Sequence, residues 1–224
     1  MTYEIQEIYC NEINELVDIS LLLNENNINS NRIDYVDCSN NNLKKINNLP
    51  IKMKYFNCSN NLINKIENLP INLSTLDCCG NEIAMIENLP DELINLYCSG
   101  NLINKIQNLP NNLKKLNISY NKISKLENLP KFLCSFSFGY CNISKLENLP
   151  KYLIYLSYKG NNITIIENLP NFLLEFYYED NIQFVDNIRI EWFGEKGFVL
   201  KHYNTIKSIQ RKVRKRLFLK DSKK

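Results

Sequence analysis

The prolines of this chain fall at a strict period. Every proline lies 20 residues from the next, and Asn-Leu precedes each one. The seven are Pro50, Pro70, Pro90, Pro110, Pro130, Pro150 and Pro170. A period of this length is typical of solenoid proteins, in which each repeat is one supersecondary unit. The repeat therefore constrains the fold more than any other feature of the sequence.

Apolar residues recur within the unit, which we number 1 to 20 with proline at position 20. They occupy positions 3, 6, 8, 13, 16 and 19, and Asn occupies position 11 in every unit but one. Positions 6 and 8 alternate with more polar positions, which indicates a short half-buried strand. One strand per unit at a constant register predicts a parallel sheet. Its apolar side is covered only when neighbouring units stack on one another.

The pattern Leu-x-x-Leu-x-Leu-x-x-Asn-x-Leu resembles the leucine-rich repeat. Eight successive matches fill residues 31–180, about two thirds of the chain. The 20-residue length and the Leu-Pro pair resemble the short repeats of secreted bacterial effectors, and the Asn-, Ile- and Lys-rich composition resembles that of giant-virus proteins. The resemblance implies an α/β leucine-rich-repeat solenoid with short parallel strands on its concave face. Because each proline holds the preceding residue extended, we expect an extended or 3₁₀ convex side, with helical or irregular caps.

The Asn column at position 11 has a predicted structural role. It lies where the chain turns away from the sheet and leaves backbone groups facing inward. An Asn side chain both donates and accepts hydrogen bonds, so it satisfies those groups. Cys141 interrupts the column. Because a thiol is the weaker partner, we predict a local weak point there and a higher melting temperature for Cys141→Asn.

Residues 1–30 do not follow the 20-residue frame, and we expect them to form an N-terminal cap. The spacing of Ile5, Ile8, Ile13 and Leu16 predicts a short amphipathic helix that covers the first strand. Residues 21–28 resemble a truncated repeat. At the other end, residues 181–200 lose the pattern but contain Trp192, Phe193 and Phe198, and we expect a C-terminal cap.

Residues 201–224 are strongly basic. They hold ten Lys or Arg and one Asp, a local charge of +9, so the remainder carries −6 of the net +3. Apolar residues at helical spacing predict an amphipathic helix or tail. Four roles are open for this segment: a capping helix with a charged outer face, a surface for nucleic acid or acidic lipid, a nuclear-import signal, and a calmodulin-type target. The candidate polyanion-binding residues are Lys207, Arg211, Lys212, Arg214, Lys215 and Arg216.

The outward positions 5 and 7 of each strand are rich in Tyr, Ser, Asn and charge. Tyr gives a large rigid contact area while Ser and Asn adapt their hydrogen bonds, as in antibody paratopes. The composition therefore predicts a protein-binding concave face, although Tyr also favours strands for its own sake. The candidate residues are Tyr35, Asp37, Tyr55, Asn57, Asp77, Asn95, Tyr97, Lys115, Asn117, Tyr155 and Tyr177.

Few residues suggest chemistry. His202 is the only histidine, and the sequence contains neither a phosphate-binding loop nor a dinucleotide-binding glycine motif. Cysteine recurs at position 8 in four successive units, which places four thiols in a line and not in the tetrahedron that zinc prefers. We interpret this column as core packing and expect no metal or cofactor. Cys79 alternates outward and is the candidate reactive thiol.

The cellular location is also a prediction. The N-terminus lacks the apolar stretch of a signal peptide, and eight cysteines in a repeat core are typical of reduced packing residues. We expect an intracellular protein, located in the cytoplasm, which includes the cytoplasm of a host cell, or in the nucleus. We do not expect secretion by a classical signal peptide.

The sequence thus predicts a non-enzymatic scaffold that binds a protein partner on its concave face. The alternative function is polyanion binding, to nucleic acid or acidic membrane, through residues 201–224. We expect no small-molecule substrate, and the sequence indicates no oligomeric state.

Overall fold

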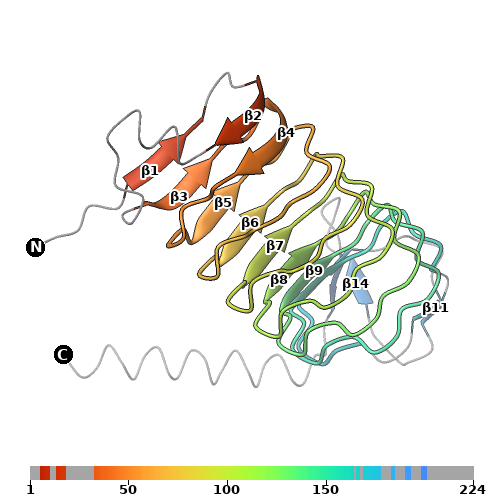
Figure 1. The fold of residues 1–224 in the computed structure, drawn as a ribbon. Coiled ribbons are helices and arrows are strands. Elements are labelled where there is room, and N and C mark those ends of the chain that lie inside the picture. Colours follow the sequence, from red (N-terminus) through yellow and green to blue (C-terminus); the bar gives the residue numbers. More distant parts are fainter. Residues whose placement is uncertain are drawn as a thin grey trace, which may run out of the picture.

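A computed structural model describes residues 6–10, 14–18, 33–163, 165–166, 169–177, 183–184, 190–192 and 198–200. Within these residues the chain winds into a solenoid whose coils stack side by side (Figure 1). An 11-stranded sheet runs through the stack in the order β1-β3-β5-β6-β7-β8-β9-β10-β12-β15-β14. This confirms the predicted leucine-rich-repeat solenoid.

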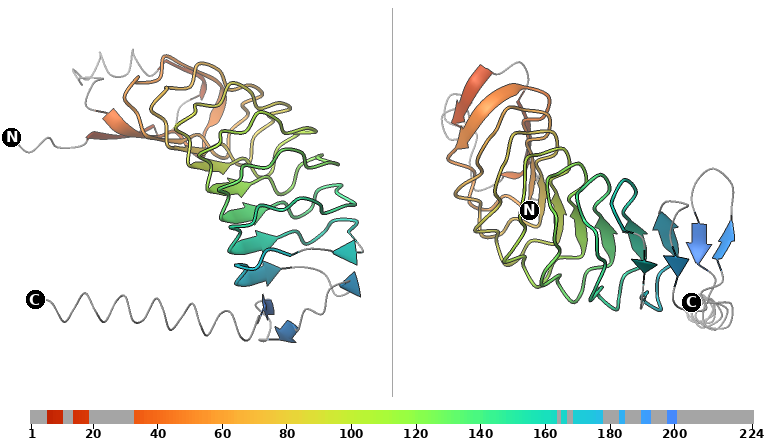
Figure 2. Two further views of the ribbon diagram at one scale, coloured as in Figure 1. Left: turned by 90° about the horizontal axis from the view of Figure 1, so that it is seen from below. Right: turned by 90° about the vertical axis from the view of Figure 1, so that its right-hand side faces the viewer.

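Each 20-residue unit contributes one short strand at a constant register. Position 6 of one coil pairs with position 6 of the next, as Leu96 does with Leu116. The strands line the inner side of the arc, and the connecting segments form its outer side (Figure 2). The strands are β3 (Ile33–Asp37), β5 (Tyr55–Asn57), β6 (Thr75–Asp77), β7 (Asn95–Tyr97), β8 (Lys115–Asn117), β9 (Ser135–Ser137), β10 (Tyr155–Ser157) and β12 (Glu175–Tyr177).

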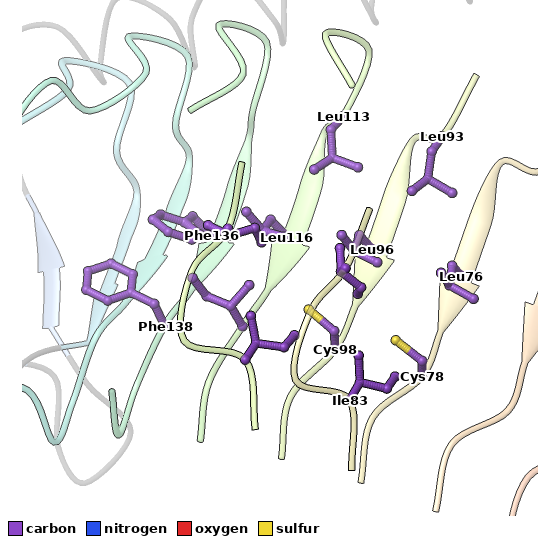
Figure 3. Close-up of a cluster of buried hydrophobic side chains, with 14 of the residues drawn as sticks. Leu76, Cys78, Ile83, Leu93, Leu96, Cys98, Leu113, Leu116, Phe136 and Phe138 are labelled. Atoms are coloured by element: carbon purple, nitrogen blue, oxygen red, sulfur yellow. The ribbon is translucent and has the colours of Figure 1, made fainter. Parts of the chain in front are cut away.

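The apolar positions of the unit form one continuous core between the sheet and the convex side. Leu93, Leu96 and Cys98 are each fully buried, and their counterparts in the neighbouring coils stack on them (Figure 3). Position 8 holds cysteine in the first coils but Phe138 and Tyr158 further along, where the rings lie 5.7 Å apart. The predicted cysteine column is therefore core packing.

The Asn column connects successive coils as predicted. The Nδ2 of Asn101 donates to the carbonyls of Cys78 in the preceding coil (3.0 Å) and Cys98 in its own (3.1 Å). Its Oδ1 accepts from the amide of Ile83 at 3.0 Å. At Cys141 the thiol makes only longer contacts, 3.3 Å to the Ile118 carbonyl and 3.9 Å to the Gly139 carbonyl.

The Asn of each Asn-Leu-Pro triplet serves a different purpose. Among the described residues, Asn48, Asn68, Asn88, Asn108, Asn128 and Asn148 have φ between 50° and 54°. Asn tolerates this left-handed region better than other residues with a β-carbon. A tight turn follows, in which the Pro90 carbonyl accepts from the Leu93 amide at 3.0 Å. The triplet therefore returns the chain from the convex side to the next strand, and the described convex residues contain no helix.

The N-terminal segment corrects one prediction. β1 (Gln6–Tyr9) pairs in parallel with β3, and β2 (Asn14–Asp18) pairs with β4 (Asn42–Asn47). The predicted capping helix is therefore wrong for residues 6–9 and 14–18, which form strands that extend the solenoid. Ile8-x-Cys10 matches Val36-x-Cys38, and the Cys10 amide donates to the Asp37 carbonyl at 2.8 Å. This strand pairing provides hydrogen-bond partners for the backbone groups along the open edge of β3, which a helix would leave unpaired.

Antiparallel strands follow the last coil. β15 (Phe198–Leu200) pairs with β14 (Ile190–Trp192) and, through Phe198 and Phe176, with β12. β11 (Ile165–Ile166) and β13 (Gln183–Phe184) form a short parallel pair. The rest of the predicted C-terminal cap, the truncated repeat at residues 21–28 and the whole of residues 201–224 lie outside the described residues.

Candidate functional site

The first candidate surface lies on the concave side of the first coils. We call Tyr9, Tyr35, Asp37, Tyr55, Asn57, Asp77 and Tyr97 the tyrosine face. The rings of Tyr35 and Tyr55 stack with centroids 4.4 Å apart and an angle of 5° between their planes. The ring of Tyr9 lies 5.6 Å from that of Tyr35, tilted by 46°. The parallel register sets Tyr35 beside Tyr55, because position 5 of each coil pairs with position 5 of the next.

Asp37 is the hydrogen-bonding centre of the tyrosine face. Its carboxylate accepts from the Tyr35 hydroxyl at 3.2 Å, from Asn57 Nδ2 at 3.0 Å and from the Ser39 amide at 2.8 Å. Burial raises the pKa of Asp37, but the hydrogen bonds from Ser39, Asn57 and Tyr35 outweigh it and hold the pKa below 3.8. Asp37 is therefore charged near neutral pH.

The tyrosine hydroxyls stay protonated. Burial and then the Asp37 carboxylate raise the pKa of Tyr35, and burial and then Asp77 raise the pKa values of Tyr55 and Tyr97. Protonated hydroxyls beside a fixed carboxylate give this face donors, an acceptor and flat apolar rings.

Eight of the eleven predicted concave residues fall into two groups, six in the tyrosine face and two at the far end of the sheet. All eleven lie on strands of the main sheet, at the outward positions 5 and 7. Tyr155 and Tyr177 form a second aromatic pair, with centroids 5.4 Å apart, at the far end of the sheet. Between the groups lie Lys115 and Asn117 and then the small side chains of β9. The six predicted polyanion-binding residues lie outside the described residues.

A second surface was missed by the sequence analysis. It is a groove of about 750 Å³ beside the strands, lined by positions 2 and 4 of the last coils. We call it the edge groove and define its apolar wall as Phe132, Cys134, Tyr152, Ile154, Phe172 and Leu174. The three rings are 44%, 39% and 45% exposed, and neighbouring centroids are 6.2 Å apart.

The sequence does contain a signal for the edge groove. Position 2 is polar in four successive units, as Lys52, Asn72, Glu92 and Asn112, and then aromatic in the three units that follow. The concave positions 5 and 7 do not reveal this change. Lysines precede two of the rings, and the Nζ atoms of Lys131 and Lys151 lie 4.8 Å from the ring centroids of Phe132 and Tyr152.

The described residues offer little chemistry. No three His, Cys, Asp or Glu side chains among them are grouped as a metal site requires. All eight cysteines are free, and six are buried. Burial and then Asp77 raise the pKa of Cys79 to about 12, so the predicted reactive thiol is a poor nucleophile near neutral pH. A search of the same residues for a helix long and apolar enough to cross a bilayer found none.

Comparison with known proteins agrees with this architecture. Neither a scan against protein-family models nor a search of curated proteins gives a match. Among solved structures, YopM from Yersinia enterocolitica WA-314 is 29% identical with a TM-score of 0.65, and the match covers 69% of this chain and 34% of that one. YopM from Yersinia pestis, described as a leucine-rich effector protein, is 26% identical with a TM-score of 0.64, over 67% of this chain and 42% of that one.

The leucine-rich-repeat domain of a Shigella effector is also similar. It is 25% identical with a TM-score of 0.53, over 58% of this chain and 62% of that domain. This chain therefore spans less than two thirds of each of these structures. The shared feature is the stack of short coils, each with one strand of a parallel sheet. By its repeat, its sheet and these neighbours, the chain has the leucine-rich-repeat fold, a solenoid of 20-residue units.

Proposed function

We propose that this chain is a non-enzymatic scaffold that binds a protein partner through the tyrosine face. Its leucine-rich-repeat neighbours support a general role in protein interaction. The observation that carries the assignment to this face is the stack of Tyr35 on Tyr55, held at one end by the Asp37 carboxylate.

Pre-organisation is the physical basis of this proposal. Binding normally costs free energy because side chains become ordered at the interface. Here the rings are already stacked, and Asn57 and Tyr35 are already hydrogen-bonded to Asp37. Aromatic side chains held in this way are the usual anchors of protein interfaces. The face therefore combines large contact area with a small ordering cost.

We also propose that the protein acts inside a cell, in the cytoplasm or nucleus. All eight cysteines are free, and Cys38, Cys58, Cys78 and Cys98 line the core as packing residues. Persistent free thiols are typical of reducing compartments. Fluorescence microscopy of a tagged chain in host cells tests this, and accumulation outside cells contradicts it.

Quantitative affinity capture tests the binding face. The bait is the intact chain, compared with the variant Tyr35→Ala/Tyr55→Ala/Tyr97→Ala. The control is Tyr120→Asn/Tyr140→Asn, which removes two exposed tyrosines that lie off the strands and places there the Asn that earlier coils carry at the same position. We expect a set of proteins retained by the intact and control baits and lost from the triple variant. Identical sets from all three baits contradict the proposal.

The alternative function, binding of nucleic acid or acidic lipid through residues 201–224, is separated by deletion. Under our proposal, a chain lacking these residues captures the same partner. Salt-dependent retention on heparin or DNA that is lost with the deletion, together with unchanged capture by the triple variant, favours the alternative.

A further inference from the structure

The edge groove runs along the axis of the solenoid and crosses five coils. Its lining begins at Glu92 and Ile94 and ends at Phe172 and Leu174. Neighbouring strands in a sheet lie about 4.8 Å apart, so four steps between coils span about 19 Å. A helix rises about 1.5 Å per residue, so a helix of about 13 residues matches this length.

The backbone at position 4 of the groove is already hydrogen-bonded. The Cys134 carbonyl accepts from the amides of Ile154 (2.8 Å) and Tyr155 (3.1 Å). The Ile154 carbonyl accepts in the same way from the next coil, and the Lys114 carbonyl accepts from the Cys134 amide. A carbonyl oxygen has two lone pairs, so these are occupied. An extended peptide that binds by adding a strand finds these position 4 groups occupied, whereas a helix satisfies its own backbone and needs only an apolar surface.

The charge around the groove is unbalanced. Lys114 lines it, and Lys131 and Lys151 lie over its rings. Within the part of the chain that the structure describes, none of these three lysines forms an ion pair. On the convex side, by contrast, Lys65 and Lys125 are each paired with the glutamate two residues on. The single carboxylate in the lining is Glu92, at the end away from the rings.

We propose that the edge groove binds an acidic amphipathic helix of a partner protein. One face of that helix carries large apolar side chains that pack against Phe132, Tyr152, Ile154 and Leu174. Carboxylates beside that face meet Lys114, Lys131 and Lys151. The chain's own residues 201–224 do not fit this description, because their charge of +9 has the same sign as the groove lysines. This surface is separate from the tyrosine face and does not depend on the function proposed for it.

Selection from a displayed library of random 16-residue peptides tests this proposal. The full chain is the target, and the variant Ile154→Asp is used for counter-selection. We expect enriched peptides with apolar residues at helical spacing and a net negative charge. Basic peptides, proline-rich peptides or no enrichment over the variant overturn the proposal.

Binding of the enriched peptides to matched variants locates the site. Ile154→Asp and the double variant Lys131→Glu/Lys151→Glu each weaken binding at least tenfold. Leu102→Asp is the control, because Leu102 is 44% exposed, like Ile154 at 43%, but lies outside the groove. It changes binding less than twofold. An equal loss with Leu102→Asp, or equal binding to phosphatidylserine vesicles and to peptide, overturns the proposal.

A measurement on the unaltered chain avoids any effect of substitution on folding. Cys134 lies in the groove wall, so its alkylation by iodoacetamide reports on occupancy. A saturating concentration of enriched peptide slows this alkylation at least fivefold. An unchanged rate at Cys134 overturns the proposal.

Discussion

Near the N-terminus, the rings of Tyr35 and Tyr55 stack on the concave sheet beside the carboxylate of Asp37. In the last three coils a row of stacked rings lines the edge groove, outside the strands, and the neighbouring charges are lysines. The concave side chains of β9, between the two ends, are serines. The first coils therefore offer a tyrosine stack beside the Asp37 carboxylate on the sheet, and the last coils add apolar rings and cations on the edge of the sheet.

Both surfaces rest on the same frame. Leu93 and Leu153 occupy equivalent positions and are equally buried, although the surface around them differs. The buried core positions fix the course of the backbone. The side chains at positions 1, 2, 4, 5 and 7 are not needed for the core, and they determine the binding surface of each part of the solenoid. A repeat of this kind separates stability from recognition, because neighbouring coils supply the first and exposed side chains supply the second.

The largest expected effect is a loss of stability of the whole solenoid, on which both surfaces depend. Asn101 belongs to the coil that supplies Tyr97 to the tyrosine face and Ile94 to the edge groove. Asn101→Leu leaves the amide of Ile83 without its partner and removes one side-chain hydrogen bond from each of the Cys78 and Cys98 carbonyls, which keep those from Asn81 and Asn121. The unsatisfied amide costs about 1–3 kcal/mol and each lost hydrogen bond about 1 kcal/mol, so we expect the free energy of unfolding to fall by about 3 kcal/mol. Urea denaturation measures this. The control is the exposed Asn64→Leu, for which a change above about 0.5 kcal/mol is not expected. Equal losses for both contradict the role of the column.

A second substitution separates the two surfaces. Tyr35→Ala removes the central ring of the tyrosine face, and we expect at least a tenfold loss of affinity for the captured partner, as for an interface anchor. Binding of acidic helical peptides to the edge groove stays the same. Surface plasmon resonance with both ligands measures this. A parallel loss of both affinities means that the two surfaces are not independent.

A smaller gain is expected in the C-terminal half. Cys141→Asn restores the hydrogen-bonding side chain that Asn101 and Asn121 carry in the same column. One added hydrogen bond contributes about 1 kcal/mol, which for a protein of this size raises Tm by about 2–4 °C. Differential scanning calorimetry measures the shift. Cys134→Asn, at a partly exposed site outside the column, is the control, and no gain at Cys141 counts against this account.

The smallest effect is the acid sensitivity of the tyrosine face. The pKa of Asp37 is held below 3.8 in the folded chain, so its charge stabilises the fold above that pH, and the contribution is lost as the pH falls through the lower folded value. Because the carboxylate is only partly buried, we expect less than about 1 kcal/mol. Urea denaturation from pH 6 to pH 2.5 should show a shallower decline for Asp37→Asn than for the unaltered chain. Identical declines exclude this role.

The repeat made most of the fold predictable. The strict spacing of proline, leucine and Asn fixed the register of the strands, the buried column and the hydrogen-bonding role of Asn101, since each depends on local pattern and stacking alone. The capping helix was wrong because the spacing of Ile5, Ile8 and Ile13 does not show that the open edge of β3 provides a pairing partner. That partner exists only in three dimensions.

The site was less predictable than the fold. The outward positions 5 and 7 follow from strand alternation, so the tyrosine face could be located, but the bonds between Tyr35, Asp37 and Asn57 depend on side-chain conformation. The edge groove lies at positions 2 and 4, in the turn before the strand, where alternation does not indicate which side chains meet. Only the change at position 2 from Asn112 to Phe132 and Tyr152 indicates the groove. That these rings form one surface follows only once the stacking of the coils is known.

The central claim is that one solenoid carries two separate binding surfaces, and sequential binding to the immobilised full chain tests it most directly. The protein captured by the tyrosine face is bound to saturation first, and an acidic helical peptide selected on the edge groove is then added. The account predicts that the peptide binds with the same affinity and stoichiometry as to the free chain. Failure of the peptide to bind, or displacement of the first partner by it, would contradict the claim.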